Sequence, residues 1–95
     1  MENNYIPKNL EEGIEYLNNE LSQEDKDYLI ENGAISVHHS LGTWIRNNWN
    51  LWNDESEIRK NISKLGYTHP DDMSNYIIEE FIKYTFYSII ADKCR

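Results

Sequence analysis

Residues 34–53, with the sequence AISVHHSLGTWIRNNWNLWN, constrain the fold more than any other part of this chain. They contain all three tryptophans, two of the three histidines and a single formally charged side chain, Arg46. The rest of the sequence is dense in carboxylates. A segment that gives up surface charge while it collects large aromatic side chains belongs in the core or on a binding face. We therefore expect the fold to be built around this segment.

The hydrophobic periodicity is helical in every long segment and does not alternate as in a half-buried strand. Asn9 and Glu12 have the spacing of a capping box, and Ser22 precedes an acidic first turn. Pro70 suits the first turn of a last helix. The expected helices are 9–21, 22–32, 36–50, a short helix capped by Asp54 or Ser56 that ends at Gly66, and 70–91.

The last expected helix is apolar on two nearly opposite sides. One stripe consists of Met73, Ile77, Phe81 and Tyr84, and the other of Ile78, Ile82, Phe86 and Ile89. A helix that is apolar all round is central to its fold or shared with a second chain. The sequence thus predicts an all-α fold, a single small domain (1–95) of four to five helices with the long C-terminal helix at its centre.

We assign the first stripe to the core and the second stripe to a partner. A two-fold pairing of this helix with a second copy is the simplest arrangement. A different protein that uses the stripe as a helix-in-groove contact is one alternative. The other is a monomer in which the N-terminal helices cover the stripe.

Charge restricts the classes of partner. The 95 residues have a formal net charge of −8, and the first 33 residues alone hold nine acidic and two basic side chains. Nucleic acid and anionic membranes bind clustered Lys and Arg, so neither is an expected partner. A single cysteine, Cys94, excludes a disulfide framework. No signal peptide or membrane span is recognisable, and we expect a cytoplasmic protein.

Two features of the Trp segment carry candidate chemistry. Asn48 falls within the apolar face of the expected helix, where it either ties the helix to a loop carbonyl or points into a pocket among the tryptophans. A polar ridge on the opposite face follows the spacing i, i+4, i+7 and i+11: His39, Thr43, Arg46 and Asn50. Its arginine either clamps an anion or pairs with Asp71, Asp72 or an N-terminal glutamate. Gly42 within the helix suggests the close approach of another group.

The histidines do not have the spacing of a metal site, because His38 and His39 are adjacent and no HExxH pattern occurs. His69, before Pro70, is expected to cap the last helix. We expect no metal ion and no cofactor, and no catalytic signature stands out. An enzyme with His38 or His69 as base and Asp71 or Asp72 as its orienting group is a minor alternative.

Two strings, HHSLGTWIRNNWNLW at 38–52 and GYTHPDDMS at 66–74, together resemble a small bacterial and phage domain family of unknown function. In that family an H…LGxWIRNxWxLW helix is followed by a G…HPDDMS helix start. The lead-in IPKNLEE at 6–12 is also similar, and the resemblance covers about residues 5–82. The tail, residues 83–95, departs from the family in being longer and more apolar.

The resemblance implies that the two strings act together, either to lock the fold or to bind something. We expect a non-enzymatic protein-interaction module, such as a regulator, an immunity-like or antitoxin-like protein, or a phage inhibitor of a host factor. The alternative is a protein that binds a small anionic or nucleotide-like ligand. The candidate binding residues are His38, His39, Thr43, Trp44, Arg46, Asn47, Asn48, Trp49, Trp52, His69, Asp71, Asp72 and Ser74.

Overall fold

The computed structural model describes residues 5–93, the last of them by its backbone alone. The elements in chain order are α1 (Leu10–Glu20), α2 (Gln23–Asn32), the 3₁₀ turn η1 (Ala34–Val37), α3 (Leu41–Asn48), α4 (Glu57–Ser63) and α5 (Pro70–Lys93). The fold is all-α, as expected, and the described part of the chain contains no strand.

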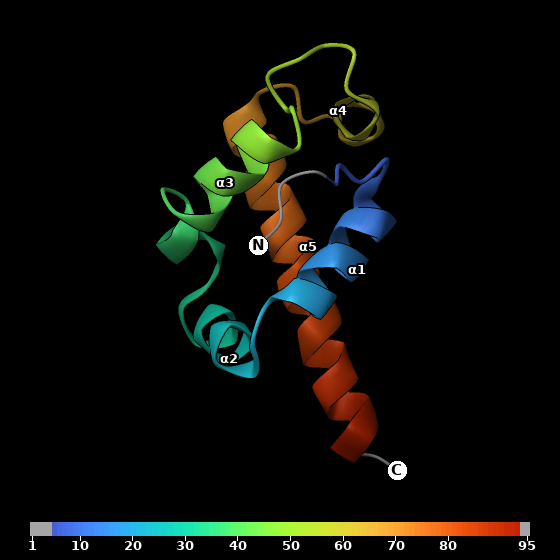
Figure 1. Cartoon of the computed structure of the whole chain (residues 1–95). Coiled ribbons are helices and arrows are strands. Elements are labelled where there is room, and N and C mark those ends of the chain that lie inside the picture. Colours follow the sequence, from blue (N-terminus) through green and yellow to red (C-terminus); the bar gives the residue numbers. More distant parts are fainter. Residues whose placement is uncertain (1–4, 94–95) are drawn as a thin grey trace.

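The long helix α5 is the centre of the fold. The helices α1, α2, α3 and α4 and the turn η1 all contact it, and Figure 1 shows them arranged around the part of α5 nearer its N-terminus. The C-terminal end of α5 extends beyond the other helices (Figure 1). This arrangement confirms that the C-terminal helix is central.

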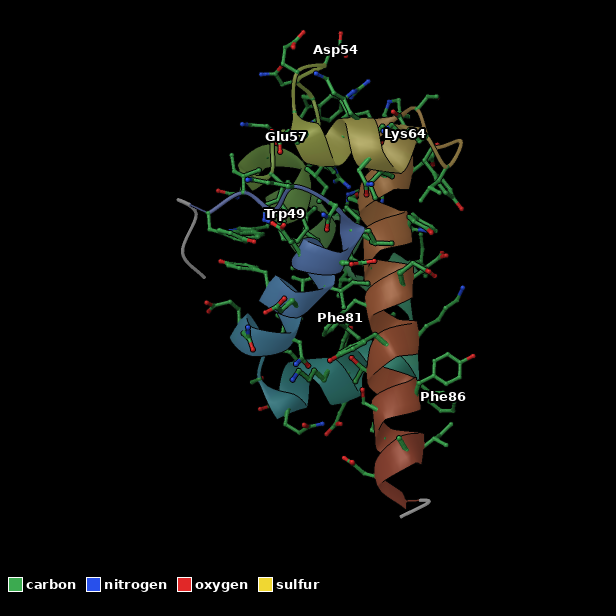
Figure 2. All side chains as sticks on the ribbon, turned by 90° about the vertical axis from the view of Figure 1, so that its right-hand side faces the viewer. Trp49, Asp54, Glu57, Lys64, Phe81 and Phe86 are labelled. Carbon is green, nitrogen blue, oxygen red and sulfur yellow. The ribbon has the colours of Figure 1, made fainter. Side chains whose placement is uncertain are left out.

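The core lies between α5 and the shorter helices. Trp49 and Phe81 are its largest fully buried side chains, and in Figure 2 both lie between the ribbons of α5 and its neighbours. The other core residues are Leu17, Leu29, Ala34, Ile45, Leu51, Ile58, Ile62, Met73, Ile77 and Ile78.

An aromatic cluster joins the N-terminal segment to the Trp segment. The ring of Tyr16 stacks on Tyr5 at 5.3 Å and on Trp44 at 6.2 Å, and it meets Trp49 edge-on at 6.0 Å. Tyr5 also donates a hydrogen bond to the Glu12 carboxylate at 3.1 Å. Desolvation and, to a smaller extent, this carboxylate raise the pKa of the Tyr5 hydroxyl. Aromatic contacts thus hold residue 5 on the domain.

The caps expected from the sequence explain where three helices begin. Asn9 accepts the Glu12 amide of α1, and Ser56, rather than Asp54, accepts the Arg59 amide of α4. Ser22 and Asp25 form a reciprocal capping box at α2. Each cap satisfies a backbone donor that has no partner within its helix.

The third expected helix, 36–50, is wrong as a single helix. The structure breaks it into η1 and α3, because Ser40 has the non-helical angles φ −112° and ψ −87°. Both the amide and the hydroxyl of Ser40 donate to the Val37 carbonyl, at 3.1 and 3.3 Å. Such local bonds compete with the regular helical pattern.

The same helix ends at Asn48, two residues early. Asn50 adopts φ 56°, and the Leu51 amide donates to the Arg46 carbonyl at 3.1 Å. These are features of a Schellman C-cap, with a left-handed residue and a buried hydrophobic residue after it. The chain therefore turns after Trp49. Leu51 is fully buried. On an unbroken helix Trp52 would share the inward face of Trp44 and Asn48, but in the structure it is 58% exposed.

The assignment of the two stripes on α5 is partly wrong. Ile78, expected on the partner stripe, is fully buried, and Tyr84, expected in the core, is exposed. The reason is that helices pack around the first part of α5 from several sides, while its end lies beyond them (Figure 1). Exposure on α5 therefore depends on position along the helix as well as on its face.

Candidate functional site

Arg46 ties the two signature strings together. Its side chain is buried, with 6% of the residue exposed. One terminal nitrogen donates to the Ser74 hydroxyl at 2.8 Å, and the other donates to the Thr43 hydroxyl and the His38 carbonyl, at 2.8 and 3.1 Å. Its Nε lies 3.3 Å from the Asp71 carboxylate. Arg46 thus pairs with Asp71, one of the partners expected from the sequence, and joins α3 to the start of α5.

Gly42 makes room for this guanidinium. A Cβ atom at position 42 would lie 3.1 Å from a terminal nitrogen of Arg46 and 3.4 Å from the Val37 carbonyl oxygen. The first distance is tight for a carbon atom, and the second is at the limit of ordinary contact. The close approach expected at Gly42 therefore comes from the arginine of its own helix.

The expected cap at His69 is present. Its Nδ1 accepts the backbone amide of Asp71 at 3.0 Å, and its ring meets the exposed indole of Trp52 edge-on at 5.8 Å. His69 is thus connected to Arg46 through Asp71, and both signature strings meet at the start of α5.

Apart from the His38 carbonyl and the Trp52 ring, the remaining candidate groups make no contact with this cluster that decides its geometry. His38 and His39 contact each other edge-on at 5.0 Å. The Asn48 side chain donates to the Trp44 carbonyl of its own helix at 2.8 Å, which is neither a loop contact nor a pocket. Asp72 is exposed. The expected ridge is also interrupted, because Asn50 lies beyond the end of α3.

A shallow polar hollow of about 640 Å³ lies beside Arg46. Asn47 and Trp52 contribute to it, together with the carboxylates of Asp54 and Glu55. All three guanidinium nitrogens of Arg46 already have partners. An anion here would have to compete with these contacts and approach like charges, so the geometry is unfavourable for an anionic ligand.

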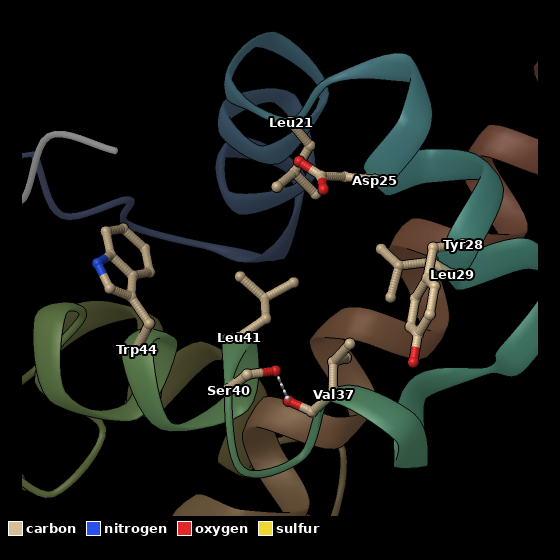
Figure 3. A pocket seen from close by; sticks show the side chains of 8 residues that line it. All are labelled: Leu21, Asp25, Tyr28, Leu29, Val37, Ser40, Leu41 and Trp44. Carbon is tan, nitrogen blue, oxygen red and sulfur yellow. Dashed lines mark hydrogen bonds between the residues drawn. The ribbon is translucent and has the colours of Figure 1, made fainter.

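The most apolar hollow lies on the other side of the Trp segment, and we call it the α2–α3 groove. Its volume is about 320 Å³, roughly twice the ~150 Å³ of an engineered cavity that binds benzene in another protein. Figure 3 shows its side chains converging from the end of α1, from α2 and from the η1–α3 segment. They are Leu21, Asp25, Tyr28, Leu29, Val37, Ser40, Leu41 and Trp44.

The surroundings of the groove are acidic. The helix α1 has four acidic and no basic residues, and α2 has four acidic residues and one lysine. Asp25 lies at the rim with its carboxylate above the apolar side chains (Figure 3). Tyr28 contributes a ring that is 50% exposed. The groove thus combines an apolar floor with a negatively charged edge.

Sequence reasoning found only Trp44 among the groove residues. The helical periodicity of residues 22–32 predicts that Tyr28 faces inward with Leu29, but Tyr28 is half exposed in the structure. The groove is lined by residues from three segments, and α3 begins only after the break at 38–40. A helical wheel treats each segment separately and therefore does not show such a groove. The sequence feature that points to the break is Ser40 itself, since serine readily bonds to nearby backbone.

No group of three or more His, Cys, Asp and Glu side chains within residues 5–93 is arranged to hold a metal ion. Over the same range, no helix combines the length and apolarity that a bilayer span needs. Cys94 lies outside the described residues.

Comparison with known proteins gives one match. No curated protein and no solved structure is significantly similar to the chain. Residues 6–85 match a family described as domain of unknown function DUF6794. The matched range includes the lead-in, both signature strings and α5 as far as Thr85. The chain therefore belongs to the DUF6794 family, a family of unknown function.

Proposed function

We propose that the protein is a non-enzymatic interaction module that holds a basic, amphipathic helix of a partner protein in the α2–α3 groove. The observation that carries this proposal is an open apolar groove set in an acidic surface. A groove of this kind suits the large apolar side chains of an amphipathic helix. Lysine or arginine on the flanks of that helix would face the carboxylates of α1 and α2.

The free energies of the two kinds of contact favour an apolar anchor in the groove over a purely electrostatic contact. Burying one large apolar side chain contributes about 1.5–3 kcal/mol, whereas an exposed ion pair contributes about 0–1 kcal/mol. Affinity should therefore come from the apolar anchor. The acidic rim should mainly speed association and reject acidic partners.

The contacts of the signature residues also support recognition at the groove. The Arg46 network is satisfied within the chain, and His69 is used as a cap. The proposal therefore gives these residues a structural role and places recognition at the groove. A small anionic ligand at Arg46 is the alternative, and it would have to displace Asp71 or Ser74.

The finer biological setting is also part of the proposal. The signature strings resemble a bacterial and phage family, and the lone cysteine suits a reducing compartment. We therefore place the protein in the bacterial cytoplasm, as a regulator, an immunity-like or antitoxin-like protein, or a phage inhibitor of a host factor.

A peptide titration followed by amide NMR tests the proposal. The probe is a helical peptide with leucines at i, i+3, i+4 and i+7 and lysines elsewhere. We expect shifts at Leu29, Val37 and Leu41 and at the Trp44 indole. A peptide with alanine in place of leucine should not bind, and one with glutamate in place of lysine should bind much more weakly.

A pair of matched variants locates the site. Tyr28→Ala should weaken binding by roughly tenfold, the effect of losing an aromatic anchor worth more than about 1 kcal/mol. Tyr87→Ala removes a tyrosine that is even more exposed, near the end of α5, and should leave binding unchanged. Shifts that map away from the groove, or equal binding of the lysine and glutamate peptides, would contradict the proposal.

A further inference from the structure

The C-terminal end of α5 presents an apolar surface of its own. Ile82, Phe86, Ile89 and Ile90 follow the spacing i, i+4, i+7 and i+8, which places them on one face of the helix. Phe86 is 48% exposed and Ile90 40%. Figure 2 shows Phe86 on the side of α5 that faces away from the other helices, and Phe81 on the side toward them. We call these four residues the α5 stripe.

This surface begins where the family domain ends. The family match stops at Thr85, whereas α5 continues to Lys93. Three of the four residues of the stripe thus lie beyond the matched range. The bundle accounts for Ile82, which packs against the core, and Ile89 is half-buried. It does not account for Phe86 and Ile90, which are exposed on the part of α5 that extends beyond the other helices (Figure 1).

The charge of this region differs from that of the bundle. Residues 82–93 contain two lysines and one aspartate, in a chain of net charge −8. The Lys83 ammonium beside the stripe is already paired with the Glu80 carboxylate at 2.9 Å. A nearly neutral surface gives a strongly charged partner no electrostatic advantage, but it allows two copies of an acidic protein to approach each other.

We propose that the α5 stripe binds the same stripe of a second copy, with the two helices antiparallel about a two-fold axis near Phe86. A two-fold interface is self-complementary, so each stripe covers the other. The antiparallel arrangement keeps the two acidic bundles at opposite ends of the pair. This dimer goes beyond the proposed partner binding and uses a different surface.

The size of the contact predicts a weak dimer. Twelve helical residues span about 18 Å, and such a contact is smaller than the roughly 800 Å² per partner of a standard stable interface. Association should therefore depend on concentration, with monomer at low micromolar and dimer at submillimolar protein.

Sedimentation equilibrium under reducing conditions tests this, since reduction prevents Cys94 from crosslinking two chains. We expect the weight-average mass to rise from the monomer value toward twice that value across the concentration range. Phe86→Glu and Ile90→Glu should each hold the protein at the monomer mass. Circular dichroism should show both variants folded, because both side chains are exposed.

Ser88→Glu is the matched control. Ser88 is exposed and lies about 200° around the helix from Phe86, so the same charge there should leave the association intact. A wild-type protein that is monomeric at submillimolar concentration would overturn the proposal. So would a dimer that persists in Phe86→Glu, or one that Ser88→Glu abolishes.

Discussion

Two glycines within helices accommodate large side chains of the Trp segment. Gly42 leaves space for the guanidinium of Arg46, and Gly13 of α1 faces the fully buried indole of Trp49. Sequence reasoning expected a close approach at Gly42 but overlooked Gly13. Each glycine costs up to about 1 kcal/mol of helix propensity relative to alanine. The space that it leaves for the large side chain beside it is the physical reason for a glycine at that position.

Gly13→Ala should therefore destabilise the protein although alanine is the better helix former. Its Cβ would lie 3.0 Å from Cζ3 of Trp49, and that ring is rigid. Overpacking costs typically about 1–3 kcal/mol, more than the gain in propensity. Urea unfolding should show a net loss of about 0.5–2 kcal/mol. Asn19→Ala, at an exposed position of α1, should be neutral or slightly stabilising, and an equal response of both variants would count against the contact.

At the scale of the elements, the sequence predicted most helices but not the shape of the Trp segment. The caps at Asn9 and Ser22 and the start of α5 at Pro70 depend on local chemistry, which a sequence displays. The break near Ser40 and the left-handed turn at Asn50 are formed by single residues and their local hydrogen bonds, which hydrophobic periodicity does not display. A helical wheel assumes an unbroken helix, and it therefore placed Trp52 inside.

The cap at the start of α5 gives a prediction at this scale. His69→Ala removes the acceptor of the Asp71 amide and should lower the free energy of unfolding by about 0.5–1 kcal/mol, as lost caps do. His69→Asn restores a good cap without adding charge and should recover most of that stability. Thermal unfolding of the three proteins compares them. If His69→Asn does not recover the stability, the imidazole contributes more than a cap, through its contact with Trp52 or through a ligand.

At the scale of the whole molecule, the sequence placed α5 at the centre but could not say how far the other helices cover it. Coverage depends on the lengths and angles of α1 to α4, which are tertiary properties. Ile78 and Phe86 have similar side chains and share a side of the helix, yet one is fully buried and the other is exposed. For the same reason the sequence did not predict the α2–α3 groove, whose walls come from three separate elements.

This uneven coverage should appear in hydrogen exchange. Amides of α5 between residues 73 and 81 should exchange slowest, near the free energy of global unfolding, because this stretch contributes the buried face of α5 to the core. Amides of 86–92 should exchange far faster at low micromolar protein and become more protected at high concentration if the α5 stripe pairs. Uniform protection along α5 in dilute solution would contradict this description of the helix.

The central claim is that the two signature strings lock α3 to the start of α5 through Arg46. A double-mutant cycle on the free energy of unfolding, with Arg46→Met, Ser74→Ala and the double variant, tests it most directly. We predict a loss of about 2–4 kcal/mol for Arg46→Met, since a hydrogen bond to a charged group is worth about 1.5–3 kcal/mol, and a coupling of at least about 1 kcal/mol with Ser74. Lys64→Met, at an exposed position, should change little. A stable Arg46→Met protein, in which the effects of the two substitutions on the free energy of unfolding add within about 0.5 kcal/mol, would contradict the lock. Arg46 would then be better explained as a residue that binds an anionic ligand.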